Sequence, residues 1–146
     1  MTGTATHSND PALIRQLLTT PGTWAVVGLS THTGRTAHGV SRWMKEQLGH
    51  RIVPVHPLAE NVFGEDGHAS LSDIPDGERI DVVDCFVTSH RVGGIVDEAI
   101  ANAQRLGITA VWLQLGVIDE GAAQRAKDAG LGVVMDTCPK IEYPRL

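Results

Sequence analysis

One loop of this sequence has the residues of a ligand-binding site. It combines two glycines, several hydroxyl side chains and one arginine. It runs from Gly28 to Thr36 and reads Gly-Leu-Ser-Thr-His-Thr-Gly-Arg-Thr. Gly28 lets the backbone turn sharply and approach a ligand closely, and Arg35 supplies a forked donor that suits phosphate oxygens. The loop leads into a predicted helix, whose first N–H groups favour an anion. The residues expected to hold the phosphates of a nucleotide-like ligand are Gly28, Leu29, Ser30, Thr31, Arg35 and Thr36.

The ends of the other predicted strands supply the rest of the expected site. In an open parallel sheet, ligands bind beyond the carboxyl ends of the strands, where the strand order reverses. The residues expected there are His56 and Pro57 after the second strand, Phe86 and Val87 at the third, Gln114 and Gly116 at the fourth, and Cys138 after the fifth.

The residues after the second predicted strand argue against NAD as the ligand. A typical NAD-binding protein places an Asp or Glu there, which accepts hydrogen bonds from ribose hydroxyls. This chain has His56 and Pro57 instead, and the nearest carboxylate is Glu60. A ligand whose ribose carries a 3′-phosphate tolerates or prefers such a neutral or cationic end. Coenzyme A, free or as an acyl-CoA, is one cofactor of this kind.

No motif for catalysis or metal binding accompanies this loop. The sequence contains neither a GxSxG nucleophile elbow nor a GxxxxGK[ST] phosphate loop. Its 7 histidines are scattered without metal-ligand spacing. His32, His38, His56 and His90 are the ones that the strand ends could bring together. We expect no catalytic residue and no metal, and an enzymatic function stays open.

The elements that must position these residues alternate between short apolar strands and amphipathic helices. Such alternation predicts parallel pairing through right-handed crossovers, and hence a Rossmann-like α/β fold. We expect a five-stranded parallel sheet in the order 3-2-1-4-5 with helices on both faces. Pro54 should lie at a strand end or bulge, because proline cannot donate to the ladder. The strands are predicted at residues 24–28, 51–55, 80–87, 110–115 and 132–135, and the helices at 11–19, 36–48, 91–106 and 119–129.

Length and composition fit one globular domain. The chain has 146 residues, of which 42% are hydrophobic and 20% charged. We expect a flexible polar tail over residues 1–9 and a single domain over 10–146. The formal net charge of −5 and the absence of a Lys/Arg cluster argue against nucleic acid, and no apolar run is long enough for a membrane span. The 2 cysteines form no disulfide framework or zinc motif, which favours a cytoplasmic location.

Taken together, several short segments resemble the small stand-alone CoA-binding domain proteins, which are similar to the CoA-binding domain of succinyl-CoA synthetase α subunits. The resemblance spans about residues 12–146. The segments that carry it are Trp24-Ala-Val-Val-Gly-Leu-Ser30, Arg35, Val53-Pro-Val-His-Pro57, Asp81-Val-Val-Asp-Cys-Phe86, Val111-Trp-Leu-Gln-Leu-Gly116, and Val133-Val-Met-Asp-Thr-Cys138 with Lys140.

The resemblance implies a CoA-binding Rossmann fold. Gly28, Ser30 and Arg35 would then serve the phosphates, and Gln114, Gly116 and Cys138 would face the mouth of the pocket. The chain departs from the family at His56, where Asn is common. It also departs at residues 87–89, where an arginine-rich segment is frequent; His90 or Arg91 is the candidate replacement.

Three functions stay open from the sequence. The first is binding of CoA or acyl-CoA without chemistry. The second is an enzyme, either a nicotinamide-dependent oxidoreductase or a CoA-ligase-related subunit. The third is a regulatory or structural protein that senses CoA, as a homodimer or with another protein.

Overall fold

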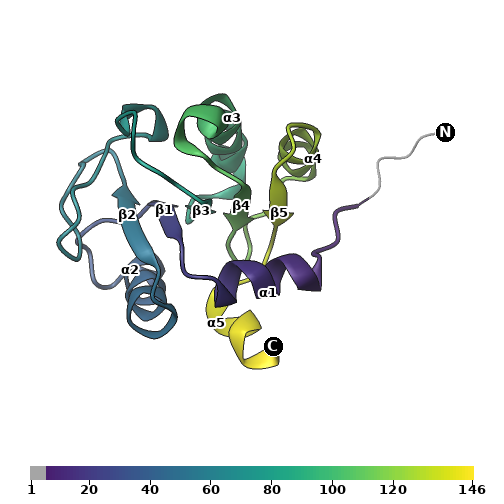
Figure 1. Cartoon of the computed structure of the whole chain (residues 1–146), viewed down its shortest axis with the longest axis horizontal. Coiled ribbons are helices and arrows are strands. Elements are labelled where there is room, and N and C mark those ends of the chain that lie inside the picture. Colours follow the sequence, from purple (N-terminus) through teal and green to yellow (C-terminus); the bar gives the residue numbers. More distant parts are fainter. Residues whose placement is uncertain (1–5) are drawn as a thin grey trace.

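A five-stranded parallel sheet forms the centre of the protein (Figure 1). The computed structural model describes residues 6–146. The predicted fold class, a parallel sheet between two layers of helices, is confirmed. The strands are β1 (Thr23–Val27), β2 (Arg51–Val55), β3 (Val82–Cys85), β4 (Ala110–Leu113) and β5 (Gly132–Val134).

The predicted strand order is wrong. The sheet runs β2-β1-β3-β4-β5, so β3 pairs with β1 and not with β2. The chain leaves β2 at one edge, crosses β1 and enters the middle of the sheet. The order therefore reverses between β1 and β3, and the loops that follow these two strands must border any ligand bound at that point.

The composition of β2 fits an edge strand, and the burial of β3 fits a central strand. β2 contains Pro54 and begins with the exposed Arg51, and both features are compatible with an edge. Pro54 lies inside β2 opposite Val26, not at a strand end or bulge, and its carbonyl accepts a hydrogen bond from the N–H of His68 (3.0 Å). β3, in contrast, is buried at every position, including the carboxylate of Asp84.

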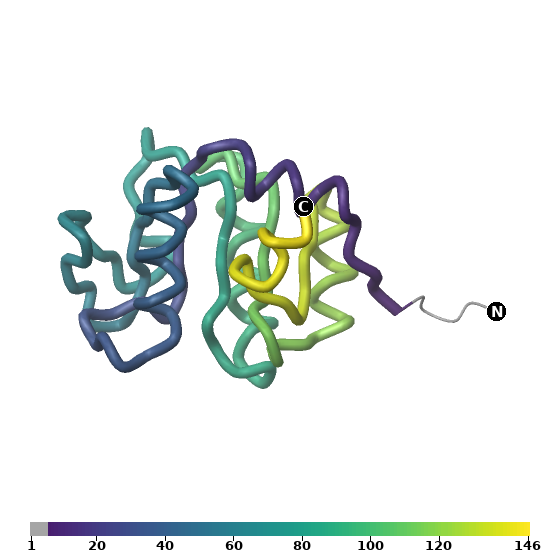
Figure 2. Tube along the Cα trace, turned by 90° about the horizontal axis from the view of Figure 1, so that it is seen from below, coloured from purple at the N-terminus to yellow at the C-terminus, as the bar shows by residue number. Residues whose placement is uncertain are grey.

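The helices cover the two faces of the sheet unequally (Figures 1 and 2). On one face lie α3 (Ser89–Leu106) and α4 (Glu120–Asp128). On the other lie α1 (Pro11–Thr19), α2 (Thr36–Trp43) with its π-helical continuation η1 (Met44–Leu48), and the short α5 (Pro139–Glu142) with a 3₁₀ turn, η3 (Tyr143–Arg145). Separate apolar clusters fill the two layers. The four predicted helices are confirmed within a few residues, whereas α5 was not predicted.

The segment between β2 and β3 is held to α3 by Arg105 and by Glu98, which accepts from the N–H of Leu71 (3.2 Å) and from the hydroxyl of Ser72 (2.9 Å). Arg105 of α3 donates to the carbonyl oxygens of Ile74 (2.6 Å), Ser72 (3.1 Å) and Leu71 (3.2 Å). These contacts fix a single 3₁₀ turn, η2 (Leu71–Asp73). Leu71 and Ile74 enter the core from this turn, so the segment covers the sheet although it contains no long helix.

The N-terminal segment contacts the outer strand of the sheet. The expected flexible tail lies outside the described residues up to residue 5. Beyond it, Asn9 donates to the carbonyl of Met135 and accepts from its N–H, each at 2.9 Å. The N–H of His7 donates to Glu120 (2.8 Å). Among residues 6–146, no helix is long and apolar enough to cross a membrane.

Candidate functional site

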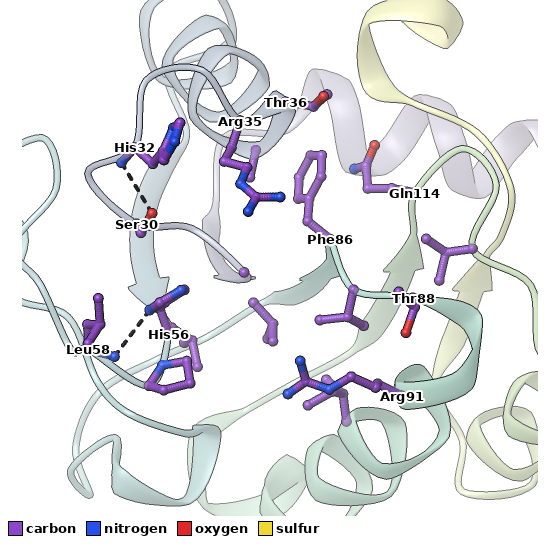
Figure 3. A pocket seen from close by; sticks show the side chains of 18 of the residues that line it. Ser30, His32, Arg35, Thr36, His56, Leu58, Phe86, Thr88, Arg91 and Gln114 are labelled. Atoms are coloured by element: carbon purple, nitrogen blue, oxygen red, sulfur yellow. Dashed lines mark hydrogen bonds between the residues drawn. The ribbon is translucent and has the colours of Figure 1, made fainter.

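A cleft of about 1120 Å³ opens where the carboxyl ends of β1 and β3 meet (Figure 3). Its walls come from the loops after β1, β2, β3 and β4 and from the segment after β5. This is the position at which open parallel sheets bind ligands, and the volume suits a large organic molecule. The corrected strand order explains the position, because β3 rather than β4 is the neighbour of β1.

Gly28 allows the two central strands to meet closely at the floor of the cleft. Its φ is +103°, in the region that favours glycine. A Cβ atom at this position would lie 2.4 Å from the carbonyl oxygen of Phe86, at the end of β3. The N–H of Gly28 donates to the carbonyl of Val55 on β2 (2.8 Å). Gly28 therefore ties the ends of three neighbouring strands into one compact floor.

Three helices begin at the cleft without a side-chain cap. Arg35 precedes α2, Thr88 precedes α3 and Cys138 precedes α5, and none of these side chains bonds to the first N–H groups of its helix. The helices that begin elsewhere are different, since Asp10 caps α1 and Asp119 caps α4. Uncapped N–H groups need another acceptor, and an anion in the cleft would supply one.

Two arginines extend into the cleft from opposite walls. Figure 3 shows the guanidinium groups of Arg35, before α2, and Arg91, in α3, directed into the same space. Within residues 6–146, neither forms an ion pair, whereas Arg51, Arg105 and Arg125 each bind a carboxylate. The two side chains thus offer ten N–H donors in all to a ligand that carries negative charge.

One carboxylate contacts the phosphate-type loop. Glu60 lines the cleft, and its carboxylate accepts from the N–H of Thr31 (3.3 Å) and from the Thr31 hydroxyl (3.1 Å). Sequence reasoning treated Glu60 as too far from the end of β2 to matter. The turn after β2, in which Ala59 has a φ of +49°, brings it back to the loop. An anion that approaches Thr31 must therefore displace or adapt to this carboxylate.

A buried acid lies behind the apolar floor. The Nε2 of Gln114 donates to Oδ1 of Asp84 (2.6 Å), while Oδ2 of Asp84 has no hydrogen-bond partner among residues 6–146. Burial raises the pKa of Asp84 to about 7, and the hydrogen bond from Gln114 opposes this rise. Sequence reasoning did not single out Asp84. The signal was an Asp in the middle of an apolar strand.

The two cysteines occupy different environments. Cys85 is fully buried in β3, and burial raises the pKa of its thiol. Cys138 is half-buried on the wall of the cleft. Burial also raises the pKa of the Cys138 thiol, and the backbone N–H groups of Lys140 and Ile141 oppose the rise. Cys138 is therefore the cysteine that a bound ligand can reach.

The structure brings most of the predicted site residues together. Two of them lie elsewhere. Leu29 is only 1% exposed and packs in the core under α2, because the loop turns its side chain inward. Gly116 lies outside the cleft wall, where its N–H donates to Asp136 (2.7 Å) and its carbonyl accepts from Ser89. The predicted residues that line the cleft are Gly28, Ser30, Thr31, Arg35, Thr36, His56, Pro57, Phe86, Val87, Gln114 and Cys138.

Sequence reasoning found Phe86 and Val87 but missed another apolar part of the wall. Its side chains come from α3, from the turn after β4 and from α5, and they could not be assigned before the packing of these elements was known. They include Ile95, Leu115, Val117 and Ile141. Of the two residues considered as replacement cations, Arg91 lines the cleft and His90 does not. In the part of the chain that the structure describes, no group of three or more His, Cys, Asp or Glu side chains is arranged to hold a metal ion.

Comparison with known proteins assigns the family. The model of the CoA binding domain family matches residues 22–144. The chain therefore belongs to this family of CoA binding domains.

Two proteins are similar to this chain over nearly its whole length. The uncharacterized protein YneT of Bacillus subtilis (strain 168) is 35% identical over 132 residues, which cover 90% of this chain and 93% of YneT. The structure of a hypothetical protein from Pyrococcus horikoshii OT3 is 33% identical, with a TM-score of 0.82, and the match covers 100% of this chain and 99% of that one.

A larger enzyme contains the same fold. The dinucleotide forming acetyl-coenzyme A synthetase 1 of Ca. Korarchaeum cryptofilum matches with a TM-score of 0.66 and 22% identity. The match covers 82% of this chain but only 26% of the synthetase. The likeness is therefore one of fold alone.

Proposed function

We propose that the protein binds coenzyme A or an acyl-CoA in the cleft between the ends of β1 and β3. The observation that carries this proposal is the pair of arginines, Arg35 and Arg91, which face one cleft without an ion-pair partner among the described residues. Both arginines are exposed residues, and their planar guanidinium groups can bind the oxygens of an anionic ligand such as a phosphate in pairs. The family assignment supports coenzyme A as the source of that anion.

The polar end of the cleft suits the phosphates. Arg35 and the first N–H groups of α2 would hold one side of the pyrophosphate, and Arg91 and the start of α3 the other. His56 suits the 3′-phosphate of the ribose. Its Nδ1 accepts from the N–H of Leu58 (3.1 Å), which leaves Nε2 as the donor toward a ligand.

The apolar end of the cleft suits the pantetheine arm. Because the sheet runs β2-β1-β3-β4-β5, the segments after β4 and β5 lie at the far end from His56. Ile95, Val117 and Ile141 contribute apolar surface there. A ligand with its phosphates at the arginines would therefore carry its sulfur end toward Gln114 and Cys138.

A nicotinamide dinucleotide is the second candidate, and one observation favours it. The Glu60 carboxylate lies beside the loop after β1, close to where a dinucleotide-binding protein uses an acid to bind ribose hydroxyls. A single calorimetric series with CoA, dephospho-CoA, NAD and NADP separates the two ligands.

CoA is expected to bind most tightly in this series. Dephospho-CoA should bind about tenfold more weakly, because it lacks the 3′-phosphate and with it at least one charge-assisted hydrogen bond. NAD binding tighter than CoA binding would overturn the proposal in favour of the second candidate.

A further inference from the structure

Two large apolar side chains are left exposed on the part of the cleft wall that lies far from His56. Leu115 follows β4 and is 62% exposed, and Ile141 lies in α5 and is 36% exposed. Both line the cleft, and neither belongs to the two apolar core clusters of residues 6–146. Exposed apolar side chains that gather at a concave site indicate contact with an apolar partner. This part of the wall is therefore expected to be covered by hydrocarbon when the cleft is filled.

The exposed position of Leu115 is fixed by the backbone of a tight turn. The N–H of Val117 donates to the carbonyl of Gln114 (2.8 Å), and Gly116, between them, has a φ of +82°, which favours glycine. The N–H of Gly116 donates in turn to the carboxylate of Asp136 (2.7 Å), directly after β5. Because these bonds tie the turn to the end of the neighbouring strand, the backbone cannot easily turn Leu115 into the core.

The charges of the cleft lie on other parts of its wall. Within residues 6–146, the charged side chains that line it come from the loops after β1 and β2 and from α3, and none comes from the segments after β4 and β5. Lys140 is exposed outside the wall, and Asp136 adds a carboxylate at the turn. A ligand group with its own carboxylate would find no cation in the wall here and would lie near a like charge, so an uncharged group is favoured.

We propose that the ligand is an acyl-CoA whose acyl group is an uncharged hydrocarbon chain, which Leu115 and Ile141 cover at the mouth of the cleft. This inference rests on the proposed binding of CoA and names the acyl group. The sulfur end of the ligand would lie toward Gln114 and Cys138, and Figure 3 shows Gln114 on the side of the cleft away from His56. Leu115 directly follows Gln114 in the chain. The N–H of Ile141 donates to the carbonyl of Cys138 (2.9 Å), so both apolar side chains lie close to where an acyl chain would begin.

A second copy of this chain is the other occupant that could cover Leu115 and Ile141. A stable interface between proteins buries about 800 Å² on each partner, far more than two side chains supply. Both side chains also line a concave wall that continues to the two cleft arginines. The continuity with the cleft favours a ligand that already occupies it.

Calorimetric titration of the full chain with acetyl-CoA, hexanoyl-CoA and hexanedioyl-CoA tests the nature of the acyl group. Hexanedioyl-CoA is as long as hexanoyl-CoA but ends in a carboxylate. Each methylene group that is fully buried should tighten binding about fourfold. Hexanoyl-CoA is expected to bind about tenfold more tightly than acetyl-CoA, because the open mouth of the cleft covers only part of the added chain. Hexanedioyl-CoA should gain much less.

A variant of Leu115 tests which side chain covers the acyl group. Leu115→Ala should reduce the ratio of the hexanoyl-CoA affinity to the acetyl-CoA affinity about threefold. The ratio is the readout, because a general loss of CoA binding leaves it unchanged. Ile118→Ala is the matched control, since Ile118 is also exposed (45%) but lies outside the cleft wall, and it should leave the ratio as it is in the wild-type protein. An unchanged ratio in Leu115→Ala would overturn the role of Leu115.

The outcomes separate this inference from the proposed function. Equal affinities of acetyl-CoA and hexanoyl-CoA would overturn the apolar chain and leave CoA binding intact. Tighter binding of hexanedioyl-CoA than of hexanoyl-CoA would overturn it in favour of a charged acyl group. Absence of binding by every CoA compound would overturn both. Sedimentation that shows a wild-type dimer and a monomeric Leu115→Ala protein would assign Leu115 to an interface between copies and overturn the inference alone.

Discussion

Replacement of Gly28 by alanine is expected to destabilise the protein by about 3 kcal/mol or more. The new Cβ would lie 2.4 Å from the carbonyl oxygen of Phe86, and a backbone atom at the end of a central strand cannot move aside as a flexible side chain can. The φ of +103° adds conformational strain for any residue with a Cβ. Overpacking and strain each cost about 1–3 kcal/mol. Urea unfolding followed by circular dichroism measures the loss.

Gly94→Ala is the matched control for Gly28→Ala. Gly94 lies on the exposed side of α3, and a Cβ there would meet nothing within 4 Å. Alanine should stabilise that helix by about 0.5–1 kcal/mol. If Gly28→Ala were as stable as the wild-type protein, the close contact between the ends of β1 and β3 would not exist as described, and the floor of the cleft would have to be rebuilt.

Replacement of Asp84 by asparagine is expected to stabilise the protein at pH 8 by about 2 kcal/mol. Burial raises the pKa of Asp84 from 3.8 to about 7, and this shift costs the folded state about 4 kcal/mol once the group is ionised. Asparagine avoids that cost but places an N–H₂ where Oδ2 had no partner among the described residues. The buried, unpaired N–H₂ destabilises the variant by about 1–2 kcal/mol, which reduces the net gain.

The sign of the pH dependence follows from the raised pKa. Between about pH 4 and pH 7 the folded state binds more protons at Asp84 than the unfolded state does. The free energy of unfolding of the wild-type protein therefore falls as the pH rises through this range. His50 acts in the opposite direction. Burial lowers its pKa to about 4, so stability is lost as the pH falls below about 6.5. The difference between Asp84→Asn and wild type cancels the His50 effect and isolates Asp84.

Unfolding free energies at pH 5 and pH 8 provide the measurement. The advantage of Asp84→Asn should be larger at pH 8 than at pH 5. Asp73→Asn, on an exposed turn, should change stability by less than about 0.5 kcal/mol at both values. An Asp84→Asn protein that is less stable than wild type at pH 8 would mean that the carboxylate has a stabilising partner.

The sequence predicts the elements of this fold well and their lateral order poorly. The periodicity of residues 91–106 and the caps at Asp10 and Asp119 are local signals, and the helices form where these signals lie. Strand order depends on how β2 connects to β3, and both strands are short and apolar. Two single residues indicate the order better than the local patterns do. Pro54 is compatible with an edge position for β2, and the full burial of Asp84 fits a central position for β3.

The sequence predicts those residues of the site that directly follow a strand. Residues directly after β1, β2 and β3 line the cleft because parallel strands share one carboxyl edge. Glu60 and Ile141 were missed because a turn after β2 and the unpredicted α5 fold back over that edge. Leu29 was placed wrongly because its orientation depends on the turn at Gly28. Side-chain direction inside a loop cannot be read from strand periodicity.

The most direct test of the central claim is the affinity for CoA when both cleft arginines are replaced. Arg35→Ala with Arg91→Ala removes the two cations that face the cleft, and the Kd should rise at least about a hundredfold, because each charge-assisted contact is worth about 1.5–3 kcal/mol. Arg15→Ala is the control, since Arg15 also lacks an ion pair within residues 6–146 but lies exposed on α1, outside the cleft wall. It should leave the Kd unchanged. Equal affinity of the double variant and the wild-type protein would contradict the account.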